Sequence, residues 1–252
     1  MKKDNSITMG GIVSIIKSIA LKCWLRCIDS KAFVKYLRKH GITVGENVNF
    51  RYPAHATIDL TRPSLIEFGS NIDINDYFTV LTHDFSTYVL RGKYHDFINS
   101  SGKVKIGNNV VIGRNVSILK GVEIGDNTII ALGSVVTKNT PPNSVIAGMP
   151  ARVVCTLDKY YEKRKQKQLG EAVEYAESIL SKGRTPRIED FSEEWCLFLT
   201  KEEYLSNPII KQKVDFRLNG YVDVDVFISH EKPFKGYDNF LQYVKEHDKR
   251  NK

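Results

Sequence analysis

The sequence contains few cysteines, and none stands in a pattern that indicates a metal finger, a redox motif or a disulfide framework. The four cysteines are Cys23, Cys27, Cys155 and Cys196, and no two of them form a C-x-x-C pair. Zinc fingers and thioredoxin-like proteins need such pairs, and small secreted folds need a denser set. We therefore expect reduced thiols and a cytoplasmic protein.

Long uninterrupted apolar runs are also lacking. Residues 7–28 carry apolar side chains at helical spacing, but Lys17, Lys22 and Arg26 interrupt them. A membrane-spanning helix needs about 20 consecutive apolar residues, so none is expected, and no small-x-small cleavage site indicates a signal peptide. Two interpretations of this helix stay open. It packs on the protein or on a neighbouring subunit, or residues 1–28 make a peripheral contact with an anionic membrane face.

Net positive charge is nearly absent outside the N-terminal arm, because the remaining basic and acidic residues almost balance. The 252 residues carry a formal net charge of +8, and residues 1–40 alone hold nine Lys and Arg against two Asp. Basic residues interleaved with aromatic ones on a sheet would favour nucleic-acid binding. Here the charge lies on a largely apolar helix, so no nucleic-acid partner is expected.

What the sequence does contain is a six-residue repeat. Aliphatic residues recur at every sixth position from Ile106 through Ile112, Ile118, Ile124 and Ile130 to Val136. This period is neither that of a helix nor that of a simple alternating strand. It is typical of a parallel β-helix, in which short strands and tight turns wind around an apolar core. Gly, Asn and Asp at the corners suit turns that need positive φ.

The repeat divides the chain into regions. Its register holds from Val44 through Val80, but Val80 and Ile106 are 26 residues apart, which is not a multiple of six, so an irregular loop leaves the coil. Val222, Val224 and Val226 alternate with aspartates as in a half-exposed strand. The regions expected are a basic helical arm (1–41), a β-helix (42–154) with an ejected loop (84–103), a helix (155–183) and a C-terminal extension (184–252).

The stretch from Ile106 to Val154, which ends in VVTKNTPPNSVIAGMPARVV, resembles the hexapeptide-repeat acyltransferases. LTHDFS at 81–86 resembles the branch of that family that acetylates hydroxyls of sugars and surface polysaccharides. The resemblance implies a left-handed coil with helical extensions and a homotrimer whose active sites lie in clefts between coils. It also implies acetyl-CoA as donor, no metal, and a sugar or glycan as acceptor.

The same resemblance implies roles for individual residues. His83 is the expected base, and Gly113 and Ala131 are expected to contact the pantetheine arm. The nucleotide end of CoA is assigned to Thr137, Lys138 and Arg152. An acceptor contact is assigned to Asn75 by the resemblance. Asp76, Asp84 and His95 are further candidates for acceptor contacts, from their residue types and positions near His83 or in the ejected loop.

Residue chemistry supports a histidine base. Acyl transfer from a thioester to an alcohol requires the hydroxyl to lose its proton during attack, and a neutral imidazole can accept that proton near neutral pH. Asp84, Asp76 or a backbone carbonyl could orient the ring of His83. Lys138 and Arg152 are suitable cations for phosphates, and backbone N–H groups are the expected oxyanion donors.

Several alternatives stay open or are disfavoured. N-acetylation of an amino sugar and acetylation of a xenobiotic would use the same donor and base. A zinc carbonic anhydrase on the same fold needs three histidine ligands, and no histidine occurs between residues 96 and 229. A catalytically inactive scaffold is the non-enzymatic alternative, and the presence of His83, Lys138 and Arg152 argues against it.

Overall fold

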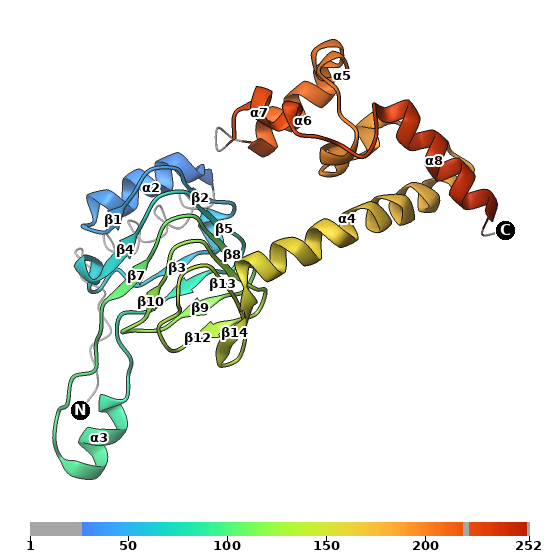
Figure 1. Cartoon of the computed structure of the whole chain (residues 1–252). Helices are drawn as coiled ribbons and strands as arrows, with labels where there is room; N and C mark the ends of the chain where they lie inside the picture. Colours follow the sequence, from blue (N-terminus) through green and yellow to red (C-terminus); the bar gives the residue numbers. More distant parts are fainter. Residues whose placement is uncertain (1–26, 219–221, 251–252) are drawn as a thin grey trace, which may run out of the picture. The chain divides into compact units, whose positions relative to one another are not determined.

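The computed structural model describes residues 27–218 and 222–250, and it divides into two compact units (Figure 1). The first unit ends at Tyr160 and contains the strands, and the second begins at Tyr161 and is helical. The expected helix over residues 7–28 lies almost wholly outside the described residues, and so does most of the proposed membrane contact of residues 1–28. Within the described ranges, no helix is both long and apolar enough to cross a bilayer.

Short strands of the first unit build three sheets that form the faces of a coil. The first face contains β1 (Thr43–Val44), β4 (Ile66–Phe68), β7 (Val104–Ile106) and β10 (Glu123–Ile124). The second face contains β2 (Val48–Phe50), β5 (Ile72–Ile74), β8 (Val110–Ile112), β11 (Thr128–Ile130), β13 (Ser144–Gly148) and β14 (Ala151–Thr156). The third face contains β3 (Thr57–Ile58), β6 (Thr79–Val80), β9 (Ser117–Ile118) and β12 (Val135–Val136).

The strands pair in parallel, with equivalent hexad positions in register, so the ladder predicted from the six-residue period is confirmed. On the first face Val44 pairs with Phe68, Phe68 with Ile106, and Ile106 with Ile124. These four side chains are buried and form one apolar column inside the coil. The coil ends differently, because β14 pairs antiparallel with β13.

Asparagines at one corner explain how the chain turns so sharply. Asn47, Asn71, Asn109, Asn127 and Asn143 all have φ between 54° and 60°. Asparagine tolerates this left-handed conformation better than most residues. Their side chains also bond from coil to coil, for example from Asn109 to Asn127 at 2.7 Å. The turn and the stacking therefore depend on the same residue type.

Helix α2 (Ser30–Lys39) covers the open end of the first coil. Phe33, Val34 and Leu37 are buried there, and the ring of Phe33 meets that of Phe50 edge-on at 4.9 Å. Ser30 is the first residue of this helix. Asp29 caps the helix by accepting from Ala32 N, and the hydroxyl of Ser30 accepts from the backbone N–H of Phe50.

The ejected loop is less irregular than expected. Between β6 and β7 it contains helix α3 (Thr87–Tyr94), which projects away from the coil (Figure 1). The loop begins and ends as a short antiparallel pairing, since His83 bridges Ser101 and Gly102 N donates to Thr82 O. His83 therefore lies at the base of this loop, where the backbone is held.

The second unit forms around α4 (Leu157–Leu180), whose buried side chains pack with the C-terminal residues. The other helices are α5 (Lys201–Ser206), α6 (Pro208–Leu218), α7 (Val224–Ser229) and α8 (Tyr237–Arg250). Short 3-10 turns are η1 (Pro53–His55), η2 (Pro63–Leu65), η3 (Ile188–Asp190) and η4 (Glu194–Leu197). Thr200 and Glu203 form a capping box at the start of α5.

The strand predicted around Val222–Val226 is wrong. Residues from Val224 onward are helical, because the side chain of Asp223 accepts a hydrogen bond from Asp225 N and caps α7. An alternation over five residues is too short to exclude one helical turn. The aromatic side chains of this region form a core of their own, in which Phe191, Phe198 and Phe240 are fully buried.

Candidate active site

The turns of the coil form two edges that carry the polar side chains of interest. The His55 edge joins the second face to the third and comprises residues 51–56, 75–78, 113–116 and 131–134. The His83 edge joins the third face to the first and comprises residues 59–65, 81–103 and 119–122.

His83 is paired with a buried carboxylate on its edge. Its Nδ1 lies 2.6 Å from Oδ2 of Asp59, and the two side chains are 17% and 3% exposed. If Nδ1 carries the proton donated to Asp59, Nε2 of a neutral ring is an acceptor. The geometry can therefore hold the imidazole in the tautomer that a general base needs.

Asp59 is held as an anion by its neighbours. Oδ1 accepts from the backbone N–H and hydroxyl of Thr61, and Oδ2 accepts from those of Thr82. Burial alone would raise the pKa of this carboxyl, but the hydrogen bonds from Thr61 and Thr82 outweigh it and hold the pKa well below its usual range. A negative charge therefore stays beside His83 across the physiological pH range.

The expected orienters of His83 have other partners, which corrects that prediction. Asp84 accepts from Ser86 N, from the hydroxyl of Ser100 and from the ammonium of Lys120. The hydrogen bond from Lys120, the largest influence, lowers the pKa of Asp84 well below its usual range. Asp84 thus ties the two ends of the ejected loop to the coil.

Asp76 also has a different partner from the one expected. It lies on the His55 edge, where it contacts His55 and Arg114 rather than His83. Asp59 was missed because it lies one coil earlier, in Thr57-Ile-Asp-Leu60. The only available signal was its position directly after β3, because β3 pairs with β6 and His83 follows β6 by three residues.

Gly113 and Ala131 lie together on the His55 edge. Their backbone N–H groups donate hydrogen bonds to Ile130 O and Ile146 O of the next coil. A ligand at these positions would therefore contact their carbonyls or pack against them. A Cβ on Gly113 would lie 2.6 Å from Leu132 N, so the glycine is required by the stacking of coils.

The residues expected at the nucleotide end follow β12 or lie on β14, and these strands contact each other. Thr137, Lys138 and Arg152 are exposed. Arg152 donates from Nη1 to Ala151 O at 2.8 Å, which leaves other guanidinium N–H groups for a phosphate. Within the described part of the chain, the ammonium of Lys138 has no hydrogen-bond or ion-pair partner, so it can also bind an anion.

Two remaining acceptor candidates are separated. The side-chain oxygen of Asn75 accepts from Asp76 N at 2.8 Å on the His55 edge. His95 is the left-handed C-cap of α3, with φ 56°, at the far end of the ejected loop. The structure therefore does not bring His95 and Asn75 to one place within a single chain.

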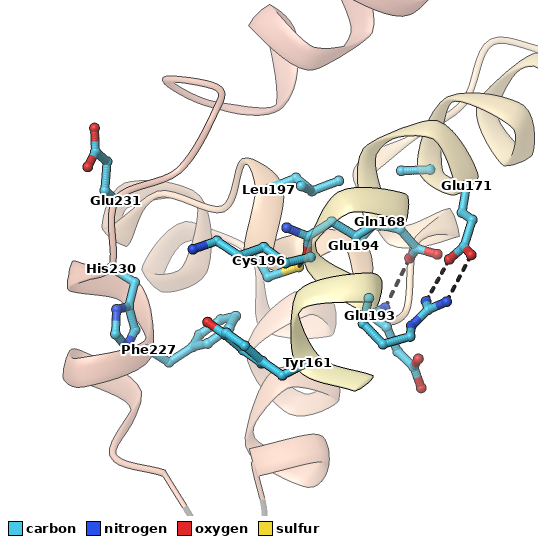
Figure 2. Close-up of a pocket in the computed structure, with 13 residues that line it drawn as sticks. Tyr161, Gln168, Glu171, Glu193, Glu194, Cys196, Leu197, Phe227, His230 and Glu231 are labelled. Atoms are coloured by element: carbon cyan, nitrogen blue, oxygen red, sulfur yellow. Dashed lines mark hydrogen bonds and ion pairs between the residues drawn. The ribbon is translucent and has the colours of Figure 1, made fainter. Parts of the chain in front are cut away.

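The helical unit contains a cavity of about 580 Å³ that holds none of these residues (Figure 2). Tyr161, Gln168, Cys196, Phe227 and His230 are among the side chains that line it. Burial raises the pKa of the Cys196 thiol, and its S–H group donates to Gln168 Oε1 at 3.5 Å. A protonated thiol is a poor nucleophile, so nothing here indicates a second reaction centre.

Comparisons with known proteins agree with this architecture. The family model described as bacterial transferase hexapeptide (six repeats) matches residues 103–138. Protein CapG of Staphylococcus aureus is 35% identical over 142 residues, which cover 56% of this chain and 81% of that protein. The chain belongs to the bacterial hexapeptide transferase family.

Two O-acetyltransferases are also similar to about half of this chain. Galactoside O-acetyltransferase of Escherichia coli (strain K12) is 37% identical over 138 residues, which cover 47% of this chain and 67% of that protein. Among solved structures, a maltose O-acetyltransferase from Clostridium difficile 630 matches with 29% identity and a TM-score of 0.40, covering 54% of this chain and 82% of that one.

Proposed function

We propose that this protein is an acetyl-CoA-dependent O-acetyltransferase that acetylates a hydroxyl of a sugar, in the synthesis of a surface or capsular polysaccharide. The observation that carries the proposal is the pairing of His83 with the buried, anionic Asp59. Family membership and the names of the relatives support the reaction class, since one relative is a galactoside O-acetyltransferase. CapG supports the link to capsule synthesis only through its name.

In this proposal His83 moves the proton. Nε2 accepts it from the acceptor hydroxyl as the oxygen bonds to the thioester carbonyl carbon, and Asp59 stabilises the resulting imidazolium. When the carbon–sulfur bond breaks, His83 returns the proton to the departing thiolate. General-base catalysis of this kind contributes about 10²- to 10⁴-fold in rate.

The donor would lie along the His55 edge. Gly113 and Ala131 would contact the pantetheine arm, and Thr137, Lys138 and Arg152 would bind the phosphates of the nucleotide. His83 lies on the other edge of the third face. One chain therefore supplies the base and the donor wall in two separate places, and this supports a trimer with sites between subunits. The left-handed coil is proposed from the resemblance to the family. We place this enzyme in the cytoplasm.

The test is release of CoA thiol from acetyl-CoA in the presence of sugars, nucleotide sugars and lipid-linked glycans. We expect turnover with at least one acceptor and its loss in His83→Ala, with circular dichroism and oligomeric state unchanged. His230→Ala, in the helical unit, serves as the matched control and should retain activity. Full activity in His83→Ala would refute the assignment of the base.

A further inference from the structure

The His55 edge carries a second histidine–aspartate pair, to which an arginine is added. Nδ1 of His55 lies 2.6 Å from Oδ1 of Asp76, and Nη2 of Arg114 lies 2.9 Å from Oδ2 of the same carboxylate. The side chain of Asp76 is 6% exposed, whereas those of His55 and Arg114 are 44% and 58% exposed. A buried anion thus holds two cationic or polar groups at the surface.

The two pairs occupy opposite edges of the third face. His55 precedes β3 and Asp59 follows it, while Asp76 precedes β6 and His83 follows it. β3 and β6 belong to adjacent coils and pair in parallel, with Thr57 opposite Thr79. Each histidine therefore contacts an aspartate of the adjacent coil. An extended chain rises about 3.3 Å per residue, so the two edges are roughly 13 Å apart. His55 therefore cannot share a partner with His83 of the same chain.

Asp76 is saturated by its own neighbours. Besides His55 and Arg114, the backbone N–H of Tyr77 donates to Oδ1 at 3.0 Å. Burial alone would raise the pKa of Asp76, but the hydrogen bond from His55 and the positive charge of Arg114 lower it below the usual value. Asp76 is therefore an internal counter-ion rather than a group that meets a ligand.

The groups left to meet a ligand point to a specific chemistry. Within residues 27–218 and 222–250, two sets of nitrogens accept or donate no hydrogen bond: Nε2 of His55 and the guanidinium nitrogens of Arg114 other than Nη2. A guanidinium offers parallel N–H groups that match a carboxylate or a phosphate. Nε2 of a neutral imidazole held by Nδ1 accepts from a hydroxyl. An anion next to a hydroxyl would satisfy both.

Aromatic rings fix the position of these groups. The ring of His55 stacks on that of Tyr77 at 4.9 Å and 10°, and on that of Tyr52 at 6.1 Å and 9°. The guanidinium carbon of Arg114 lies 5.6 Å from the centre of the Tyr77 ring. Both tyrosines are about half exposed. The cluster is therefore pre-organised, with flat apolar surface beside its polar groups.

The cluster lies beside the proposed acetyl-CoA site, and its role as inferred here rests on the proposed function. Arg114 directly follows Gly113, and the edge continues from there towards Tyr77, Asp76 and His55 on the preceding coils. We propose that His55, Asp76 and Arg114 form an acceptor subsite for an anionic sugar, in which Arg114 binds a carboxylate or phosphate and His55 accepts from a neighbouring hydroxyl. Asp76 and the tyrosines position these two side chains.

Direct binding tests the subsite without turnover. In the His83→Ala protein, titrations with glucuronate, glucose 1-phosphate and glucose should show at least about 10-fold tighter binding of one or both anions, because a charged hydrogen-bonded pair is added. Arg114→Gln should abolish this preference and leave glucose binding unchanged. Arg217→Gln, which removes an exposed arginine from the helical unit, should leave every affinity unchanged.

The two anionic arms identify the source of the charge. Selective loss of glucuronate binding in Arg114→Gln assigns the subsite to a uronic acid, and selective loss of glucose 1-phosphate binding assigns it to a glycosyl phosphate. Equal affinity for all three probes, or an unchanged preference in Arg114→Gln, would overturn the subsite.

Kinetics separate this inference from the proposed function. In the otherwise wild-type protein, Arg114→Gln should raise KM for an anionic acceptor about 10-fold and leave KM for acetyl-CoA unchanged. A rise only in KM for acetyl-CoA would place Arg114 in the donor site and overturn the subsite. Acetyl transfer with no anion preference would refute the subsite alone, whereas anion binding without transfer to any sugar would refute the proposed function.

Discussion

Oδ2 of Asp59 lies 2.6 Å from Nδ1 of His83, although 24 residues separate them in the sequence. One complete turn of the coil takes 22 residues here, from Ile58 to its partner Val80, so His83 lies two residues beyond the position equivalent to Asp59. The parallel ladder therefore places the residue after β3 directly beside the residues after β6. The pairing arises from the fold, because neither residue belongs to the other's local motif.

Replacement of Asp59 by asparagine should reduce kcat by about 10²- to 10⁴-fold, because an amide can no longer stabilise the imidazolium or select the tautomer of His83. KM for both substrates should change little. The measurement is steady-state thiol release with a verified acceptor. Asp73→Asn, which alters an ion pair with Arg51 on the second face, is the control, and an unchanged kcat in Asp59→Asn would show that the pair is only structural.

Replacement of Arg152 by alanine should raise KM for acetyl-CoA about 10-fold and leave KM for the acceptor unchanged, since its exposed guanidinium is assigned to a phosphate. Initial-rate measurements that vary one substrate at a time separate the two constants. Arg217→Ala controls for the loss of one positive charge. An effect confined to the acceptor would contradict the nucleotide role.

Replacement of Gly125 by alanine should destabilise the β-helix by about 1–3 kcal/mol, the usual range for overpacking. A Cβ there would lie 2.3 Å from Pro142 N and 2.7 Å from Pro141 C, which are backbone atoms of the next coil. Gly92→Ala is the control, because nothing lies within 4 Å of its Cβ position and the residue is in α3. Urea denaturation followed by circular dichroism should show a lower free energy of unfolding for Gly125→Ala than for Gly92→Ala. Equal free energies would show that adjacent coils can shift to accommodate the extra methyl group.

Replacement of Tyr204 by phenylalanine should change the alkaline stability of the helical unit. The Tyr204 hydroxyl donates to Asp215 at 2.6 Å, and this bond raises the pKa of Tyr204 from 10.0 to about 12. Because the folded pKa lies above the unfolded one, the stabilisation is complete below pH 10 and is lost as the pH rises towards 12.

Tyr204→Phe should accordingly lower the free energy of unfolding by about 1 kcal/mol below pH 10. Above pH 10, the free energy of unfolding should fall less steeply with pH than in the wild-type protein. Thermal unfolding from pH 7 to pH 12 measures both effects, and Tyr243→Phe serves as a control for the loss of a phenol. A decline of equal steepness in Tyr204→Phe and the wild-type protein would rule out this hydrogen bond as the cause.

The sequence pattern predicted the structure correctly where the same residue type recurs at a fixed spacing over several coils. The hexads predicted the parallel ladder because each residue stacks on the residue in the same position of another coil, as Ile106 does on Ile124. The break in register after Val80 predicted the ejected loop that carries His83. Pattern was a poor guide over short stretches, and the alternation at Val222–Val226 proved to be part of a capped helix.

The sequence by itself determined the repeat, the family resemblance and the identity of the histidine at the register break, because these depend on residue types at fixed spacing. Only the tertiary structure decided which carboxylate meets which histidine. Asp84 is adjacent to His83 in sequence but is held by Lys120 and Ser100, whereas Asp59 and Asp76 reach His83 and His55 from neighbouring coils. The physical reason is that coil stacking brings residues within one or two positions of equivalent register into contact, so a partner about one turn away is closer in space than many neighbours along the chain.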